Sequence, residues 1–293
     1  MRSGMVAVVG RPNVGKSSLM NALIGRKISI VSHKPQTTRH RIQGVLHDER
    51  GQVVFVDTPG LHIKETRALN QVMNAAAAGA IHDVELILWV VEAGYFNDED
   101  TAVLERLKLS KSPVALVVNK VDKYEDKGKE KLLPELEKLT ALANFTFVVP
   151  VSAHKKDNLE ALKNALFANL PEGEPMYPED MDMGHNVSFA AAEIIREKLI
   201  RNLHQEMPYA TAVEIEAYER EPTMDRISAI IWVEREGQKA IVIGNGGETL
   251  KLIGSNARRD IERAVGRKVF LKLWCKVKEN WSDDPKALTK FGY

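Results

Sequence analysis

Cysteine is almost absent from this chain of 293 residues, which contains only Cys275. A single cysteine excludes an internal disulfide and a metal site built from several cysteines, and it fits a reducing compartment. Long apolar runs are absent too, because the longest, Leu86 to Val91, is far too short to cross a bilayer. No charged and then apolar leader precedes the first expected strand, and the closing residues TKFGY carry no cysteine for lipidation. We therefore expect a soluble, cytoplasmic protein.

The chain also lacks an excess of either charge, with 41 Lys and Arg residues against 40 Asp and Glu residues. No global electrostatic field therefore marks a nucleic-acid or membrane partner, although a local field can exist within a balanced total. The hydrophobic fraction of 44% and the charged fraction of 28% are those of an ordinary globular protein. The length is comfortable for two domains.

The first 170 residues alternate short apolar runs with longer helical stretches. The runs VAVV, VVFV, LILWVV, VALVV and FVVPV are apolar throughout, which is typical of strands buried on both faces. The alternation predicts a parallel α/β sheet wrapped by helices. Between residues 171 and 185 the prolines and acidic residues show no periodicity, which indicates an interdomain linker. We expect domains at 1–170 and 186–293.

Past the linker the pattern predicts a helix, two strands, a second helix and a last strand, which together form a small α+β module. The first helix places Phe189, Ile195 and Leu199 on one stripe. Charge is segregated here: residues 238 to 280 contain ten basic and four acidic residues, whereas residues 185 to 237 contain six basic and ten acidic residues.

The segment GRPNVGKS follows the first apolar run and fits the spacing of a phosphate-binding loop. Its glycines allow backbone N–H groups to turn towards phosphates. Lys16 is expected to reach the β- and γ-phosphate oxygens as a catalytic group, and Ser17 to bind Mg²⁺. The expected nucleotide contacts in this loop are Gly10, Arg11, Pro12, Asn13, Val14, Gly15, Lys16, Ser17 and Ser18.

Three further motifs stand at the ends of later strands. Asp57 is expected to hold Mg²⁺ through water and Gly60 to donate its N–H to a γ-phosphate, so that the expected contacts of this turn are Asp57, Thr58, Pro59, Gly60 and Leu61. The motif NKVD contributes Asn119, Lys120, Val121 and Asp122, and the turn VSA contributes Ser152 and Ala153.

The NKVD motif predicts a preference for guanine. Asp122 can accept hydrogen bonds from the ring N–H and the 2-amino group of guanine, whereas adenine has no 2-amino group and would leave a carboxylate unpaired. Lys120 can place its methylene groups over the base. Asn119 can bond the other edge of the base or brace the phosphate loop. GTP and GDP are therefore the expected ligands.

A polar and basic stretch from Ser32 to Arg41 is expected to form a switch loop that offers a threonine hydroxyl to Mg²⁺. Thr37 and Thr38 both qualify, and we favour Thr38. Leu61 occupies the position at which a polar side chain would orient the attacking water, so intrinsic hydrolysis is expected to be slow. Asn13 either helps to bind a monovalent cation, in which case K⁺ accelerates hydrolysis over Na⁺, or is only a hydrogen-bonding loop residue.

Within the basic part of the second module lies the tetrad GNGG, Gly244 to Gly247. Glycines around a tight turn before a helix let a phosphodiester backbone approach the helix N-terminus, as in KH modules. The alternative is an ordinary turn that starts a helix. The expected RNA contacts are Ile243, Gly244, Asn245, Gly246, Gly247, Lys251 and Arg258.

The motifs GRPNVGKS, QTTRH, DTPGL and NKVD, followed by VEREGQKAIVIGNGG, together resemble the Era family of bacterial GTPases over essentially the whole chain. The resemblance implies a Ras-like P-loop GTPase domain that requires Mg²⁺, followed by an α+β type II KH domain. It also implies binding of the 3′ end of 16S rRNA during maturation of the 30S subunit, a monomeric state and peripheral association with the inner membrane. Many relatives have a lysine where this chain has Gly246, which should weaken phosphate contact slightly.

Two other functions compete with this interpretation. A GTP-regulated RNA-modifying enzyme would need a nucleophilic or metal site in the second domain, but Cys275 falls on the apolar side of a strand pattern. A membrane-associated signalling GTPase would use the KH-like domain to dock proteins, and the missing lipid anchor argues against it.

Overall fold

The computed structural model describes residues 1–25, 42–57, 84–125, 128–178, 187–203, 207 and 210–291. They fall into two compact units, of which the first contains the described residues up to 178 and the second contains those from Val187 onward.

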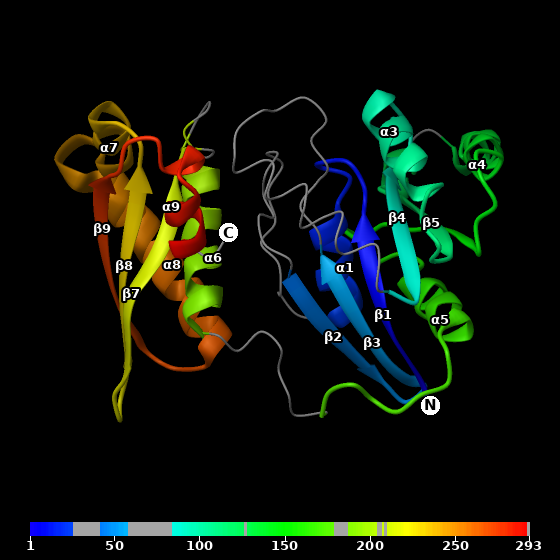
Figure 1. Ribbon diagram of the computed structural model, residues 1–293, viewed down its shortest axis with the longest axis horizontal. Helices are drawn as coiled ribbons and strands as arrows, with labels where there is room; N and C mark the ends of the chain where they lie inside the picture. Colours follow the sequence, from blue (N-terminus) through cyan, green and yellow to red (C-terminus); the bar gives the residue numbers. More distant parts are fainter. Residues whose placement is uncertain are drawn as a thin grey trace. The chain divides into compact units, whose positions relative to one another are not determined.

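A six-stranded sheet with the order β2-β3-β1-β4-β5-β6 forms the centre of the first unit, and Figure 1 shows its first five strands side by side in this order. All neighbouring strands run parallel except β2, which is antiparallel to β3. The strands are β1 (Arg2–Val9), β2 (Ile42–Asp48), β3 (Gly51–Asp57), β4 (Leu86–Glu92), β5 (Val114–Asn119) and β6 (Val148–Pro150).

Helices cover both faces of this sheet, and the central strands are apolar on both sides for that reason. Every residue of β4 is buried, and the cluster on one face of the sheet includes Trp89, Val103 and Leu139 from β4, α3 and α4. The helices of this unit are α1 (Lys16–Ile24), α3 (Asp98–Leu107), α4 (Leu133–Thr140) and α5 (Leu159–Asn169), with 3₁₀ turns at Val121–Tyr124 and Lys129–Lys131.

The sequence pattern predicted five parallel strands and did not include β2. Gly44 and His47 interrupt its apolar residues, so its sequence shows neither a continuous run nor a clean alternation. It forms because it pairs along its whole length with β3, from Ile42 opposite Asp57 to Asp48 opposite Gly51.

Residues 171–178, the start of the expected linker, lie against the first unit. Ser3 N donates to Pro171 O at 3.1 Å, and Gly173 N donates to Met1 O at 3.0 Å. The buried side chain of Gln52 accepts from Met176 N and Tyr177 N and donates to Tyr177 O at 2.6 Å. The expected linker residues from 179 to 185 lie outside the described part of the chain.

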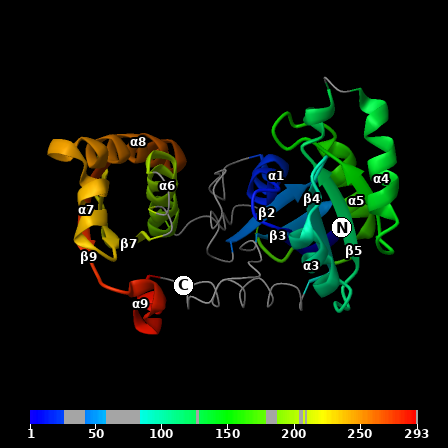
Figure 2. The same cartoon turned by 90° about the horizontal axis from the view of Figure 1, so that it is seen from above.

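The second unit has a three-stranded sheet of order β7-β8-β9, in which β7 and β8 are antiparallel and β8 and β9 are parallel. Figure 2 shows α6 and α8 on one side of this sheet and α9 on the other. The elements are α6 (Val187–Asn202), β7 (Ala212–Arg220), β8 (Asp225–Val233), α7 (Glu236–Ile243), α8 (Glu248–Val265), β9 (Val269–Val277) and α9 (Pro285–Lys290).

The predicted order of helix, two strands, helix and strand is present, with α7 and α9 in addition. Ile195 and Leu199 of α6 enter the core, as their spacing predicted, and pack there with Ile253, Ala257 and Ile261 of α8. Phe189 is only partly buried. Among the residues that the structure describes, no helix is both long and apolar enough to cross a membrane.

Candidate nucleotide site and RNA-binding surface

The loop from Gly10 to Gly15 joins β1 to α1 and passes close to two other parts of the sheet. Gly10 has a φ of 153°, and a Cβ there would lie 2.4 Å from Val90 O. Gly15 has a φ of 100°, and its Cβ would lie 2.3 Å from Asn119 Nδ2. Both positions therefore require glycine, which is the reason for their spacing in the motif.

Lys16, the first residue of α1, is buried, and its ammonium group lies inside the loop. Lys16 Nζ donates to Gly10 O and Arg11 O, both at 2.9 Å. The N–H groups of the first turn of α1, which begins with Lys16, Ser17 and Ser18, have no acceptors within the helix. A lysine held beside these N–H groups makes a strong site for phosphate oxygens.

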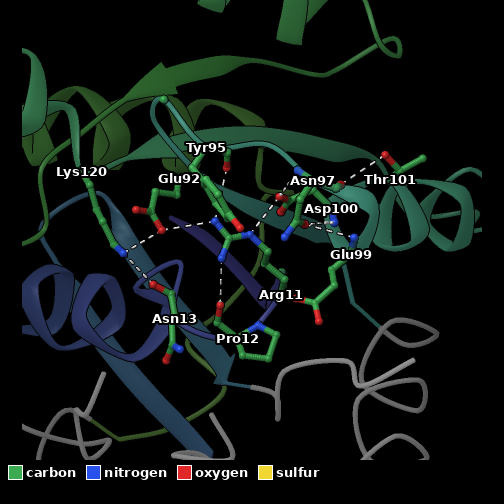
Figure 3. A network of polar contacts seen from close by, with 12 residues as sticks. Arg11, Pro12, Asn13, Glu92, Tyr95, Asn97, Glu99, Asp100, Thr101 and Lys120 are labelled. Atoms are coloured by element: carbon green, nitrogen blue, oxygen red, sulfur yellow. Dashed lines mark hydrogen bonds and ion pairs between the residues drawn. The ribbon is translucent and has the colours of Figure 1, made fainter. Parts of the chain in front are cut away.

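The side chain of Arg11 is directed away from the loop into a buried ion-pair network, which Figure 3 shows. Its Nε donates to Asp100 Oδ2 at 2.9 Å, and its Nη2 donates to Glu92 Oε2 at 3.2 Å and to Tyr95 O at 3.3 Å. The guanidinium also lies 4.8 Å from the centre of the Tyr95 ring. Its Nη1 donates to Pro12 O of the loop at 3.2 Å, so this side chain fixes the loop to β4 and α3.

Asp100 belongs to the capping box of α3, in which Asn97 Oδ1 accepts from Glu99 N and Asp100 N, and Asp100 Oδ2 accepts from Asn97 N. Burial raises the pKa of Asp100, against the opposing effect of Arg11. The cap therefore joins the start of α3 to the phosphate loop through a single carboxylate.

Glu92, the last residue of β4, joins this network to the NKVD motif (Figure 3). Its Oε2 accepts from Lys120 Nζ at 2.8 Å, and its Oε1 accepts from Lys123 Nζ. Burial raises the pKa of Glu92, but the hydrogen bonds and charges of Lys120 and Lys123 outweigh this effect and lower the pKa to about 2. Lys120 Nζ also donates to Asn13 O at 2.7 Å, so the ammonium group of the lysine expected to cover the base is held by two acceptors.

Asn119 braces the phosphate loop, one of the two alternatives that the sequence left open. Its Nδ2 donates to Val14 O at 2.9 Å, and its Oδ1 accepts from Ala153 N at 3.0 Å. One buried amide therefore connects the ends of β5 and β6 with the phosphate loop.

Asp122 and Ser152 lie together at the same edge of the sheet. Ser152 Oγ donates to Asp122 Oδ1 at 2.5 Å and accepts from Lys155 N at 3.1 Å. Val121 N donates to Val151 O at 3.2 Å, which closes the turn that presents Asp122. Ser152 is buried and Asp122 is half-buried, so the carboxylate is oriented by a fixed hydroxyl and keeps an accessible side.

Several expected site residues lie outside the described part of the chain: Thr37, Thr38, Thr58, Pro59, Gly60 and Leu61. The backbone of Asp57 ends β3, but its side chain also falls outside the description. Of the three expected Mg²⁺ ligands, only the side chain of Ser17 is therefore described, at the start of α1 beside the phosphate loop.

In the second unit, the tetrad GNGG forms the turn between α7 and α8. Gly244 has a φ of 76°, and a Cβ there would lie 2.2 Å from Thr249 Oγ1. Gly246 and Gly247 also have positive φ, but a Cβ at either position would meet nothing within 4 Å. The outer side of the turn is therefore open to the approach of another backbone.

The charged residues near this turn differ in their surroundings. Lys251 is exposed, whereas Arg258 Nη1 donates to Glu262 Oε1 of its own helix at 2.8 Å. Ile243 is partly buried at the end of α7. Two exposed aliphatic residues flank the turn as well, Ile241 and Leu252, each with an exposed fraction of 52%. Neither residue was predicted from the sequence, although both fall outside the apolar stripes that form the core.

Comparison with known proteins gives two family matches on this chain. Residues 5–120 match the family described as 50S ribosome-binding GTPase, and residues 206–282 match the KH domain family. GTPase Era of Stenotrophomonas maltophilia (strain R551-3) is 53% identical over 290 residues, which cover 99% of this chain and 97% of that protein. The chain belongs to the Era family of GTPases. GTPase Era of Xanthomonas oryzae pv. oryzae (strain MAFF 311018) is also 53% identical, over 292 residues.

Two solved Era structures agree with this assignment. A point variant of Aquifex aeolicus Era bound to GDP and AlF4⁻ has a TM-score of 0.96 and 38% identity, and covers 100% of this chain and 99% of its own. Era in complex with MgGDPNP and nucleotides 1506–1542 of 16S ribosomal RNA has a TM-score of 0.94 at the same identity, 38%, and the same coverage. The predicted fold, a Ras-like P-loop GTPase domain followed by a KH domain, is confirmed, and this Era-family chain is a GTP-hydrolysing enzyme.

Proposed function

We propose that this chain is a GTP-dependent switch that binds the single-stranded 3′ end of 16S rRNA during assembly of the 30S subunit. The main support for this proposal is that one chain contains both an open GNGG turn and a guanine-nucleotide site whose Asn119 and Asp122 side chains are fixed by hydrogen bonds. The likeness to Era solved with MgGDPNP and a 16S rRNA segment, over the full chain, supports this combination.

In the nucleotide site, Asp122 selects guanine and Lys16 binds the β- and γ-phosphates. The residues fit Mg²⁺ because a serine hydroxyl at the start of α1 and a carboxylate at the end of β3 are hard oxygen ligands. Ser17, Asp57 and Thr38 would hold the ion, which supplies charge neutralisation between the phosphates. Gly60 senses the γ-phosphate, and Leu61 keeps intrinsic hydrolysis slow because it cannot orient water.

We also propose that K⁺ accelerates GTP hydrolysis, and the position of Asn13 supports this. It is exposed, has a φ of 66°, and its backbone carbonyl is held by Lys120, so its side chain stands at the rim of the loop (Figure 3). We expect faster GTP hydrolysis in K⁺ than in Na⁺ at equal ionic strength, and we expect Asn13→Ala to remove the difference. Equal rates of the unaltered protein in both salts would reject the cation site.

In the second unit, the GNGG turn clamps about four nucleotides, with Ile243 and Lys251 beside it. Ile241 and Leu252 offer apolar surface for the bases of this segment. Arg258 contributes to RNA binding only if it exchanges its bond to Glu262 for one to phosphate. We expect the protein to act as a monomer.

The proposed function is tested by the affinity of a labelled 16S 3′-end oligonucleotide for the full chain, loaded with a non-hydrolysable GTP analogue. Binding that is lost in Gly246→Asp supports the clamp. Failure of the unaltered protein to bind the oligonucleotide in any nucleotide state would reject it.

The alternative function, a GTP-regulated RNA-modifying enzyme, is not supported by the surroundings of Cys275. Burial raises the pKa of this thiol to about 11, and the side chain packs against the core of the second unit. A thiol with so high a pKa is a poor nucleophile near neutral pH.

Peripheral association with the inner membrane is a further proposal, consistent with the absence of a membrane-spanning helix among the described residues. Sedimentation with anionic vesicles tests it, and protein that stays in the supernatant at low salt would reject it.

A further inference from the structure

The two faces of β9 are occupied by different kinds of residue. Leu271, Leu273, Cys275 and Val277 pack against the core beneath the sheet, together with the buried Val269. The alternating residues point to the opposite face, which we call the outer face: Phe270, Lys272, Trp274 and Lys276 on β9, with Arg226 and Trp232 on β8.

Two large rings on this face are half-exposed. The exposed fraction is 49% for Phe270 and 47% for Trp274. Large apolar side chains gathered on the surface of a folded unit commonly mark a binding surface.

Each ring is accompanied by a cation. Arg226 Cζ lies 5.1 Å from the centre of the Phe270 ring, and Lys272 Nζ lies 4.8 Å from the centre of the Trp274 ring. Lys276 Nζ lies 6.0 Å from the Trp232 ring on the neighbouring strand. Aromatic rings and cations therefore alternate along β9 at intervals of about 6.6 Å, the distance of two residues in a strand.

The charges on β9 favour an anionic ligand, whereas the acidic residues of this face lie on β7, with Glu219 opposite Arg226 and Glu214 opposite Ile230. The segment Val269–Val277 contains two lysines and no acidic residue. Within the described residues, neither Lys272 nor Lys276 forms an ion pair, whereas Arg226 is paired with Glu221 at 2.5 Å. The unpaired positive charge therefore lies along the edge strand, between and beside the exposed rings.

This edge lies next to the proposed clamp. The helices α7 and α8, which enclose the GNGG turn, both pack against β9, and Gly254 of α8 lies against Leu273. These contacts are on the inner side of β9, and β9 is the last strand of this sheet among the described residues, so a chain of nucleotides that leaves the clamp reaches the outer face by passing around this edge.

We propose that the outer face of β9 is a second RNA-contact surface, in which Phe270 and Trp274 stack unpaired bases and Lys272 and Lys276 bind the phosphates between them. Surfaces that bind single-stranded nucleic acid usually combine aromatic rings, on which any base can stack, with cations that contact the phosphate backbone. This inference rests on RNA being the ligand of the second unit and adds a surface separate from the GNGG turn.

The test compares ring and non-ring variants in the full chain loaded with a GTP analogue, with a labelled 16S 3′-end oligonucleotide of about 14 nucleotides, long enough to extend beyond a four-nucleotide clamp. We expect Phe270→Leu and Trp274→Leu each to weaken binding about tenfold, whereas Trp274→Phe keeps most of the affinity because a ring remains. Lys272→Ala and Lys276→Ala should each reduce the slope of log affinity against log salt by about 0.7.

Leu109→Ala serves as the matched control, because Leu109 is an exposed apolar residue of the first unit with an exposed fraction of 86%. Equal melting temperatures of all variants exclude loss of folding.

Unchanged affinity in both leucine variants, with affinity lost in Gly246→Asp, would overturn the second surface and leave the clamp intact. If Gly246→Asp also binds normally, the proposed RNA function of the unit fails with it. Leucine variants that bind RNA normally but no longer bind the 30S subunit would show that the face contacts protein instead, which also contradicts the proposal.

Discussion

Side chains around the phosphate loop are buried and bonded to one another, whereas those around the GNGG turn and the outer face of β9 are largely exposed. Arg11, Glu92 and Asn119 are buried, with exposed fractions of 5%, 8% and 2%. Lys251, Phe270 and Trp274 stand in solvent. A site that must distinguish one base from another needs fixed polar groups, because an unmatched buried group is costly. A surface that follows a flexible strand gains from backbone access and adaptable cations.

The two regions should therefore respond differently to substitution. A change in the nucleotide site should alter stability and binding together, because its groups also hold loops and strands in place. A change on the RNA surfaces should alter binding and leave the melting temperature unchanged.

Replacing Asp122 with asparagine should weaken GTP binding about 10⁴-fold, because the amide cannot accept both donors of guanine. The same amide offers an N–H to the 2-oxo group of xanthine, so the variant should gain affinity for xanthosine nucleotides. Titration calorimetry with both nucleotides measures this change. GTP affinity within tenfold of the unaltered protein would show that Asp122 does not read the base.

Replacing Glu92 with glutamine should lower the free energy of unfolding by about 3 kcal/mol at neutral pH, since Lys120, Lys123 and the buried guanidinium of Arg11 each lose a charged partner. The folded-state pKa of about 2 is below the usual 4.5, so this stabilisation is complete above pH 4.5 and is lost as the pH falls towards 2. The difference between the two proteins in urea unfolding should therefore shrink on acidification. A difference independent of pH would contradict the ionic role of Glu92.

Replacing Gly246 with aspartate should weaken RNA binding about 30-fold, because a carboxylate at the open turn repels phosphate. A Cβ at this position meets no atom within 4 Å, and the strain of a non-glycine residue at a φ of 57° costs only about 1 kcal/mol, so the melting temperature should fall by no more than a few degrees. Oligonucleotide binding and thermal unfolding, measured on one preparation, check both parts. A large loss of stability would show that the turn, like the nucleotide site, is held in place by interactions with the rest of the unit.

Replacing Gly246 with lysine should strengthen RNA binding about threefold and make the salt dependence steeper by about 0.7 in log units. The gain is small because a residue other than glycine at a φ of 57° carries some strain. Gly246→Gln is the neutral control of similar length. If glutamine and lysine change the affinity equally, charge is not what this position lacks.

Much of the nucleotide site could be predicted from the sequence. The strands whose residues are all apolar, and the motifs at their ends, identified the nucleotide site, because the carboxyl ends of parallel strands meet at one edge of the sheet. The sequence could not decide between the two roles of Asn119, since bracing depends on Val14 O and Ala153 N, which approach only in the fold. The role of the Arg11 side chain was missed for the same reason, because Glu92 and Asp100 come from distant segments.

In the second unit, the sequence pattern predicted a last strand with Cys275 on its apolar side but not what the other face of this strand does. From the sequence alone, Lys272 and Lys276 belong only to the basic segment from residue 238 to residue 280. Only the pairing of β8 with β9, which places Arg226 beside Phe270, and the exposure of the rings reveal an aromatic and basic surface.

We expect the nucleotide state of the first unit to control RNA binding by the second unit. This expectation is tested most directly by the affinity of the 16S 3′-end oligonucleotide at fixed salt, first with a non-hydrolysable GTP analogue and then with GDP. We expect tighter RNA binding in the GTP form and, by linkage, an equal increase in the affinity for the GTP analogue, relative to GDP, when RNA is bound. Equal RNA affinity in the two nucleotide states would contradict it, and the two sites would then act independently.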